Sequence, residues 1–227
     1  MKRPIGLAAT LLLHLGCMSS AQKPPNEAAN AAEYELTFTG MWNAGTHPLE
    51  YPEAGPFSGP HFSGVIGATH DGDYHIIRNG EMPTPGLERL SEEGKHAPLD
   101  DEIRKQIAAG RAGALFETGP VKDQTMPATT RFHVDANHPM VSFVAMIAPS
   151  PDWFTGAADV ALFENGAWVQ ERTIDLLAWD SGGDDGTTYK ADDRDTHPKK
   201  PTMLNASPHF QRDGQSVPVA RVVLRKL

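Results

Sequence analysis

Apolar and polar residues alternate in short segments along most of this chain. Residues 34–39 place an aromatic or aliphatic side chain at every second position, which predicts a strand with one buried face. Residues 140–148 are almost continuously apolar and rich in strand-forming residues. This run predicts a strand that is buried on both faces and ends at Pro149. The pattern therefore favours a mainly β protein.

Shorter segments of the same kind complete this prediction. Asn165-Gly166 lies between two of them and is a strong hairpin signal, because both residues tolerate a positive φ. His70-Asp71-Gly72-Asp73 predicts a turn. The pattern becomes strongly β from Phe132 onward, and further strands are expected at residues 62–66, 74–78, 159–163, 168–171, 173–179 and 217–224.

Residues 85–109 break this pattern and predict two short helices. The first begins at Pro85 and ends at Gly94. The second begins with the acidic residues 100–102, which suit the positive end of a helix dipole, and ends at Gly110. Both are expected to be peripheral helices on a β domain.

The composition agrees with a folded, turn-rich protein. Among 227 residues, 39% are hydrophobic, which is enough for a core, and 21 glycines and 19 prolines are spread along the chain without a period. The formal net charge of −9 disfavours nucleic acid and anionic membranes as partners. It suits cation binding only where carboxylates converge, and scattered acidity serves solubility alone.

The N-terminal residues 1–21 are expected to be an export signal. Lys2 and Arg3 precede a short apolar stretch that is too short to span a bilayer. No other hydrophobic segment of the sequence has spanning length. Two cleavage sites compete, before Cys17 as in a lipoprotein and after Ala21. In the first case Cys17 would carry a lipid anchor, and in the second it is discarded with the leader.

Cys17 is also the sole cysteine, so an intrachain disulfide and a cysteine-based zinc site are excluded. Residues 22–33 are small, polar and contain proline, which predicts a flexible tether. The folded domain is expected to cover residues 34–227. The protein is thus expected in the cell envelope, the periplasm or the extracellular space.

Two acidic loops carry the candidate chemistry. Asp152 follows the apolar strand 140–148, and Asp180 and Asp184 flank Gly182-Gly183 after the strand 173–179. Calcium prefers six to eight oxygen ligands, and the two glycines let the chain fold back so that both carboxylates can face one point. Spacing alone leaves two readings open, a calcium site and a solvated turn. An EF-hand is excluded, because Gly182 and Ala191 occupy its third and twelfth positions.

The same loops resemble signature blocks of the spondin domain, the family of F-spondin and mindin. The first block is Pro149-Ser150-Pro151-Asp152-Trp153-Phe154, and the second is Trp179-Asp180-Ser181-Gly182-Gly183-Asp184. Ser181 and Gly183 depart from the usual alanine and threonine of the second block. The resemblance covers residues 34–204 and is also carried by 37–42, 66–70 and 86–94.

The resemblance implies an antiparallel β-sandwich shaped like a C2 domain, with Ca²⁺ bound at its loop end. It implies Asp152, Asp180 and Asp184 as the calcium ligands. It also implies a non-enzymatic role in adhesion or matrix binding, with a protein or glycan ligand outside the cell. The animal members carry disulfides and thrombospondin-type repeats that this sequence lacks, so their partners do not transfer.

A competing hypothesis is a metal-dependent envelope hydrolase that uses the Asp-rich loops. An enzyme needs a base or nucleophile beside the metal, and a site flanked by His70, His133 or His138 would favour it. The His70–His75 stretch also allows a transition-metal cluster, although the family resemblance makes it a turn. Trp153, Trp168 and Trp179 are expected to be core or loop-anchoring residues.

Overall fold

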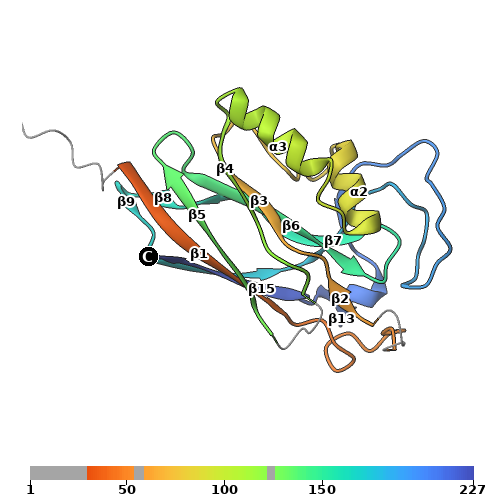
Figure 1. Cartoon of the computed structure of the whole chain (residues 1–227). Coiled ribbons are helices and arrows are strands. Elements are labelled where there is room, and N and C mark those ends of the chain that lie inside the picture. The colour runs from red at the N-terminus through yellow and green to blue at the C-terminus, as the bar shows by residue number, and fades with distance from the viewer. Residues whose placement is uncertain (1–29, 54–58, 122–125) are drawn as a thin grey trace, which may run out of the picture.

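The protein consists of two antiparallel β-sheets packed face to face, with two helices outside one of them (Figure 1). The computed structural model describes residues 30–53, 59–121 and 126–227. The predicted all-β class is therefore confirmed, as are the short peripheral helices. The signal peptide, Cys17 and residues 22–29 of the predicted tether lie outside the described residues.

The smaller sheet has four strands. Their order is β10 (Glu171–Leu176), β15 (Ala220–Lys226), β1 (Ala31–Gly40) and β5 (Ala128–Asp135). Residues 31–33, expected to belong to the flexible tether, are instead the first residues of β1. They pair there with residues 133–135 of β5. Backbone pairing has thus extended the strand beyond the alternating pattern.

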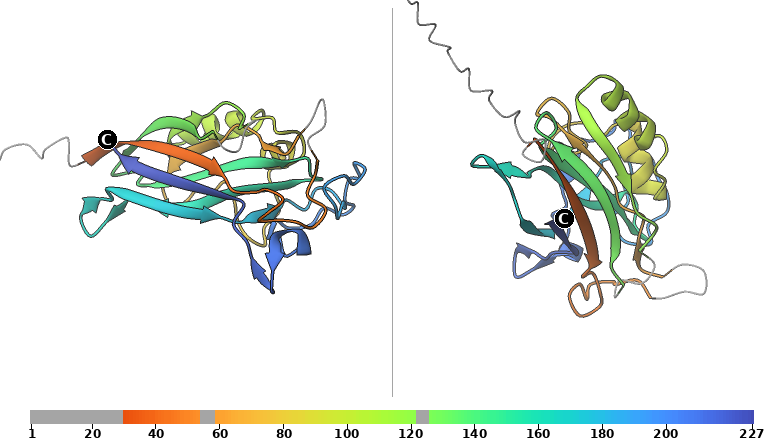
Figure 2. Two further views of the ribbon diagram at one scale, coloured as in Figure 1. Left: turned by 90° about the horizontal axis from the view of Figure 1, so that it is seen from below. Right: turned by 60° about the vertical axis from the view of Figure 1, so that its left-hand side comes forward.

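The larger sheet places β6 and β7 at its centre. Its order is β12 (Met203–Leu204), β11 (Ala178–Asp180), β7 (Trp153–Ala161), β6 (Met140–Ala148), β3 (Ile66–His70) and β4 (Ala112–Glu117), with β2 (His61–Phe62) also paired to β6. Two small hairpins stand apart, β8–β9 (Phe163–Glu164 and Ala167–Trp168) and β13–β14 (Gln211–Arg212 and Gln215–Ser216). The β13–β14 hairpin projects from the sandwich in the left panel of Figure 2.

The main core fills the space between the two sheets. Tyr34, Leu36 and Phe38 enter it from β1 at every second position, as the alternation predicts. Phe143 and Ile147 enter it from β6. Burying a side chain of this size contributes about 1.5–3 kcal/mol, so this alternation is a main source of stability.

A second core lies between the larger sheet and the helices α2 (Pro85–Glu93) and α3 (Leu99–Ala108). Val144 of β6 belongs to this core, together with Leu87 and Leu90 of α2 and Ile103 of α3. Both faces of β6 are therefore buried, which confirms the interpretation of its continuous apolar run. Figures 1 and 2 show the two helices together over the outer face of this sheet.

The local signals at the ends of α2 act as predicted. The Thr84 hydroxyl oxygen accepts a hydrogen bond from the Leu87 amide, and Gly94 ends the helix with a φ of 65°. The predicted Asn165-Gly166 turn is also confirmed, with φ values of 53° and 78° between β8 and β9. A short 3₁₀ helix, η1 (Pro208–Phe210), was not predicted.

Several strand predictions need correction. Residues 74–78 form no strand, because Ile76 and Ile77 are both buried against the helices and backbone pairing is not needed to cover them. The predicted strand 62–66 splits into β2, which ends at Phe62, and β3, which begins at Ile66. β4 was missed. β7 begins at Trp153 rather than at residue 159, because its N-terminal half is buried and does not alternate.

The predicted strand 173–179 is divided between the two sheets. β10 pairs with β15 in the smaller sheet, whereas β11 pairs with β7 in the larger one. Leu177 lies at the change of sheet, and its carbonyl accepts a hydrogen bond from the Thr155 hydroxyl of β7. This crossing carries Asp180 to the start of β7.

A buried histidine lies where β3 ends. The Nδ1 of His70 faces the Asp71 carbonyl at 2.6 Å and therefore carries the hydrogen, so its Nε2 accepts from the Ser142 hydroxyl at 2.7 Å. Asp159 adopts a φ of 54° at the adjacent irregularity of β6–β7 and binds His75. Both nitrogens of His70 are thus engaged in structural contacts.

We expect His70 to make stability depend on pH. Burial lowers the pKa of His70 below 6.5, against smaller opposing effects of the Asp71 carbonyl and the Asp159 charge. The unfolded chain takes up a proton near 6.5 and the folded chain does not, so stability is lost as pH falls below 6.5. Denaturant unfolding of His70→Gln between pH 7 and pH 5 should show a shallower loss than the wild type. The exposed His133→Gln should behave like the wild type, and an equal slope in all three proteins would contradict this role.

Candidate metal centre

The pairing of β7 with β11 brings the two predicted acidic loops together. Asp180 is the register partner of Trp153, so the end of β11 lies beside the residue that follows Asp152. The Ser181 amide donates a hydrogen bond to the Asp152 carbonyl at 3.3 Å. The spacing of the sequence did not decide whether the two acidic loops meet. For Asp152 and Asp180, the register of β7 with β11 brings them together.

Asp152 is the most deeply buried acid of this centre, with 0% of its surface exposed. Its Oδ2 accepts three hydrogen bonds, from the Ser181 hydroxyl at 2.9 Å, the Gly183 amide at 2.8 Å and the Asp184 amide at 3.1 Å. Its Oδ1 is buried and has no hydrogen-bond partner among the described residues. Burial raises the pKa of Asp152, and this outweighs the lowering effect of the three donors.

Asp180 carries the second carboxyl group. Its Oδ1 accepts a hydrogen bond from the Gly182 amide at 3.0 Å. Burial and then the charge of Asp152 raise the pKa of Asp180 to about 6, while Lys200 acts in the opposite direction. Two nearby carboxylates that repel each other at neutral pH are a favourable environment for a cation.

Asp184 is close to this pair but is used differently. Its Oδ1 accepts from the Gly186 amide and its Oδ2 from the Arg194 amide, each at 2.5 Å. The Thr196 amide donates to the Gly183 carbonyl, and the Asp185 amide donates to the Arg194 carbonyl. These bonds close the neck of the 186–193 loop. The charge of Asp184 nevertheless contributes to raising the pKa of Asp152.

The three predicted ligands thus share one loop cluster without converging on a single point. Within residues 30–53, 59–121 and 126–227, no three side chains of His, Cys, Asp or Glu already stand as a metal-binding group. The oxygen-only donor set and the unpartnered, buried Oδ1 of Asp152 still fit a hard cation such as Ca²⁺. A carboxylate oxygen that accepts one amide hydrogen bond retains a further lone pair for such an ion.

Sequence reasoning missed a fourth acid, Glu92 of α2. The Glu92 Oε1 lies 2.7 Å from the position that a Cβ on Gly183 would occupy. The Glu92 carboxyl group therefore packs directly against the Gly183 backbone. Burial, then the charges of Glu88 and Asp152, raise the pKa of Glu92 to about 7. The sequence did contain a signal for this residue. Glu92 and Glu93 lie at the C-terminal end of the predicted helix, where the helix dipole disfavours acidic side chains.

Two lysines border the acids. Lys199 donates a hydrogen bond to Glu88, and Lys200 donates to Asp185 at 2.6 Å. The Lys200 amide also donates to the Gly182 carbonyl, which holds the 199–200 segment against the site. These cations are committed to the outer acids, and Asp152 has no comparable basic partner among the described residues.

The histidines named as enzyme indicators lie elsewhere. His70 is paired with Met140 at the start of β6, whereas Asp152 follows the other end of that strand. His138 binds Asp135 and the Gly110 carbonyl, and His133 is exposed on β5. Trp153 and Trp168 are buried as expected, and Trp179 is half-buried and stacks on Phe154.

Residues 32–217 match the protein family described as Spondin_N. The chain belongs to the Spondin_N family. Spondin-1 of Xenopus laevis is 33% identical over 212 residues, and Spondin-1 of Rattus norvegicus is 34% identical over 214 residues. Each alignment covers 88% of this chain and 26% of the relative.

Spondin-2 of Homo sapiens is also similar, with 31% identity over 236 residues. That alignment covers 97% of this chain and 70% of Spondin-2. The chain therefore spans about a quarter of the Spondin-1 relatives and more than two thirds of this Spondin-2. The resemblance inferred from the two Asp-rich blocks is confirmed. In the part of the chain that the structure describes, neither helix combines the length and the apolar character needed to cross a bilayer.

The chain reversal at Gly182 is expected to be essential to this centre. Gly182 has a φ of 84°, and a Cβ there would lie 2.2 Å from the Lys200 carbonyl oxygen. Gly182→Ala should therefore lower the free energy of unfolding by about 3 kcal/mol or more. Gly166 has a φ of 78° with open space around it, so Gly166→Ala should cost only about 1–2 kcal/mol. Equal losses in urea unfolding would show that the Lys200 contact is unimportant.

Proposed function

We propose that this protein is a non-enzymatic, calcium-binding spondin module that acts outside the cytoplasm. In this proposal Ca²⁺ lies between the Asp152 loop and the 180–184 loop. The module then presents a surface to a protein or glycan ligand in the extracellular space or on a cell surface. Membership of the Spondin_N family supports the extracellular, non-enzymatic role.

The observation that carries the calcium proposal is the unpartnered Oδ1 of the fully buried Asp152. A buried carboxylate oxygen without a partner is costly, because it has lost its hydration. The neighbouring acids Asp180, Asp184 and Glu92 add repulsion to that cost. A divalent cation would offset both effects at once, and protein carboxylate and carbonyl oxygens are the ligands that calcium prefers.

Each residue has a defined part in this proposal. Asp152 directs its free Oδ1 to the ion, while its Oδ2 holds the amides of Gly183 and Asp184 in place. Asp180 supplies the second carboxylate. Asp184 fixes the loop through the Gly186 and Arg194 amides and adds a third carboxylate. When bound, Ca²⁺ would supply charge neutralisation and a cross-link between the two loops.

An envelope hydrolase is the weaker candidate. The predicted indicator His70 lies at the other end of β6, and its ring nitrogens are engaged by Asp71 and Ser142. His209 lies nearer to Asp180, but its ring nitrogens are engaged by Ser207 and Glu50. Because the ring nitrogens of both histidines are engaged, neither favours a catalytic base beside a metal ion. We therefore prefer the non-enzymatic binding module to the hydrolase.

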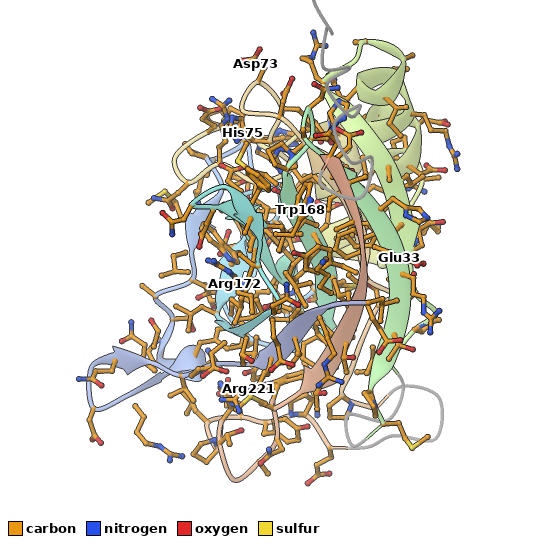
Figure 3. The ribbon with its side chains drawn as sticks, turned by 90° about the vertical axis from the view of Figure 1, so that its left-hand side faces the viewer. Glu33, Asp73, His75, Trp168, Arg172 and Arg221 are labelled. Carbon is orange, nitrogen blue, oxygen red and sulfur yellow. The ribbon has the colours of Figure 1, made fainter. Side chains whose placement is uncertain are left out.

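Thermal unfolding with calcium and with chelator tests the proposal. If calcium is present at roughly 100 times its dissociation constant, binding to the folded state adds about 2.7 kcal/mol and raises the Tm by about 5–10 °C. Asp152→Asn should lose this increment. Asp73→Asn is the matched control, since Asp73 extends into solvent at the top of Figure 3. It follows the end of β3 that pairs with Met140, whereas Asp152 follows the opposite end of β6. A wild-type Tm that is the same in calcium and in chelator would refute calcium binding.

Asp180→Asn separates ion binding from a structural role. Because the folded-state pKa of about 6 lies above the usual 3.8, the stabilising contribution of Asp180 is present below 3.8 and lost as pH rises through 6. In chelator at pH 7.5 the variant should therefore melt at or above the wild-type Tm. In calcium it should melt below the wild type. A loss of similar size in both buffers would mean that Asp180 serves the fold and not an ion.

A further inference from the structure

The smaller sheet turns one of its faces away from the core. Residues at every second position of its strands fill the main core, among them Leu36, Phe132 and Val222. The positions between them point outward. Both helices pack on the larger sheet, so they leave this outer face uncovered (Figure 2). The side chains of Arg131 and Arg225 are each 62% exposed there.

Strand register aligns four charged side chains in a line across this face. Glu171 of β10 is the partner of Arg225 of β15, which is also the partner of Glu35 of β1. Glu35 is in turn the partner of Arg131 of β5. From β10 to β5 the charges therefore alternate as acid, base, acid, base. We call these four residues the charged row.

The arginines of the charged row are only partly used by the chain itself. The Arg225 Nε donates to Glu171 at 2.9 Å, and the Arg131 Nε lies 3.5 Å from Glu35. A guanidinium group has five N–H donors, so these contacts take up part of its capacity. Exposed pairs of this kind also add little to the stability of a single chain. The row can thus form a second set of ion pairs with a surface that approaches it.

Two further rows complete this surface towards the loop end. The next row is uncharged and consists of Thr173, Val223, Thr37 and Thr129. Its short side chains let another flat surface come close. In the row after it, Arg221 donates to Asp175 at 2.6 and 3.0 Å. The three rows hold three arginines and three acids, so a second copy meets no net repulsion from them although the chain carries a charge of −9.

The order of the charges makes this face complementary to itself. In a two-fold dimer, residue i of one copy meets residue j of the other, and j meets i. An axis that runs along the strands between β15 and β1 exchanges those two strands, and likewise β10 and β5. Arg225 then faces the partner's Glu35, and Glu171 faces the partner's Arg131. With both arginines on the two central strands, like charges would meet instead.

We propose that two copies of this protein pack face to face through the smaller sheet, as the two sheets of a sandwich do. Strands about 4.8 Å apart, with six paired residues of about 3.3 Å each, give a sheet face of roughly 400 Å² per copy. This is a small interface. It predicts a weak dimer with a dissociation constant on the order of 100 µM.

This arrangement would bring two candidate metal centres to one side of the dimer. β10 ends at Leu176, directly before the change of sheet that carries Asp180 to the centre. Because the axis runs along the strands, the loop ends of both copies point in the same direction. Such a dimer would hold a ligand by two sites at once. The inference goes beyond the proposed function and does not require calcium to bind.

Sedimentation velocity over a range of protein concentrations tests the dimer. Between about 5 µM and about 500 µM, the wild type should shift from monomer to dimer. The shift should be the same in calcium and in chelator, which separates this proposal from the calcium proposal. A wild type that remains monomeric at the highest concentration would overturn it.

Two charge reversals show whether the charged row forms the contact. In Glu35→Arg the partner's Arg225 meets an arginine, and in Arg225→Glu the partner's Glu35 meets a glutamate. Each variant alone should therefore dimerise about tenfold more weakly than the wild type. An equimolar mixture of the two restores opposite charges at every position of the row. The mixture should dimerise within about threefold of the wild type, since mixing cannot repair a merely structural defect.

Two more variants complete the experiment. Arg104→Glu should dimerise like the wild type, because Arg104 is 59% exposed on α3, outside the other sheet. Thr37→Lys breaks no ion pair and places a charge against the partner's Val223, so it should weaken the dimer about tenfold even if a charge reversal fails to fold. Melting curves report folding. Reversals that dimerise like the wild type, or a mixture as weak as its components, would contradict the proposal.

Discussion

The loop end of this domain, which holds the candidate metal centre, depends on one buried carboxylate, that of Asp152. Its Oδ2 collects a hydroxyl and two amide hydrogen bonds from residues 181–184, so it connects the β6–β7 loop to the segment after β11. These bonds stabilise the chain reversal that Gly182 and Gly183 permit. They also leave the second oxygen of Asp152 buried and unpaired, which is the observation behind the calcium proposal.

Much of the fold could be predicted from periodicity. The strand at 34–39, the doubly buried strand at 140–148, the Asn165-Gly166 hairpin and the helix that ends at Gly94 all follow from local patterns. The predictions failed where tertiary packing replaced local pattern. Ile76 and Ile77 look like part of a strand, but the helices bury them without one, and the start of β7 is buried so evenly that it shows no alternation.

The candidate site could be predicted only in part, again because tertiary packing decides which residues meet. Asp152 and Asp180 could be named from their loops, but their proximity depends on the change of sheet at Leu177 and on the β7–β11 register. No sequence pattern in the chain specifies that pairing. Glu92 was missed because it comes from a helix about 60 residues earlier in the chain, and only packing of α2 against the 182–183 segment brings it close.

The closed neck of the 186–193 loop has a consequence for how this family can diversify. Backbone bonds between 183–185 and 194–196, together with the two bonds of the Asp184 carboxylate, hold the two ends of the loop together. Tyr189 anchors the middle of the loop, because it is buried in the main core and packs against Trp153, the neighbour of Asp152. Homologues can therefore vary the exposed positions 190, 192 and 193 more readily than Tyr189 or the neck, since those positions are not part of the contacts that hold the acids.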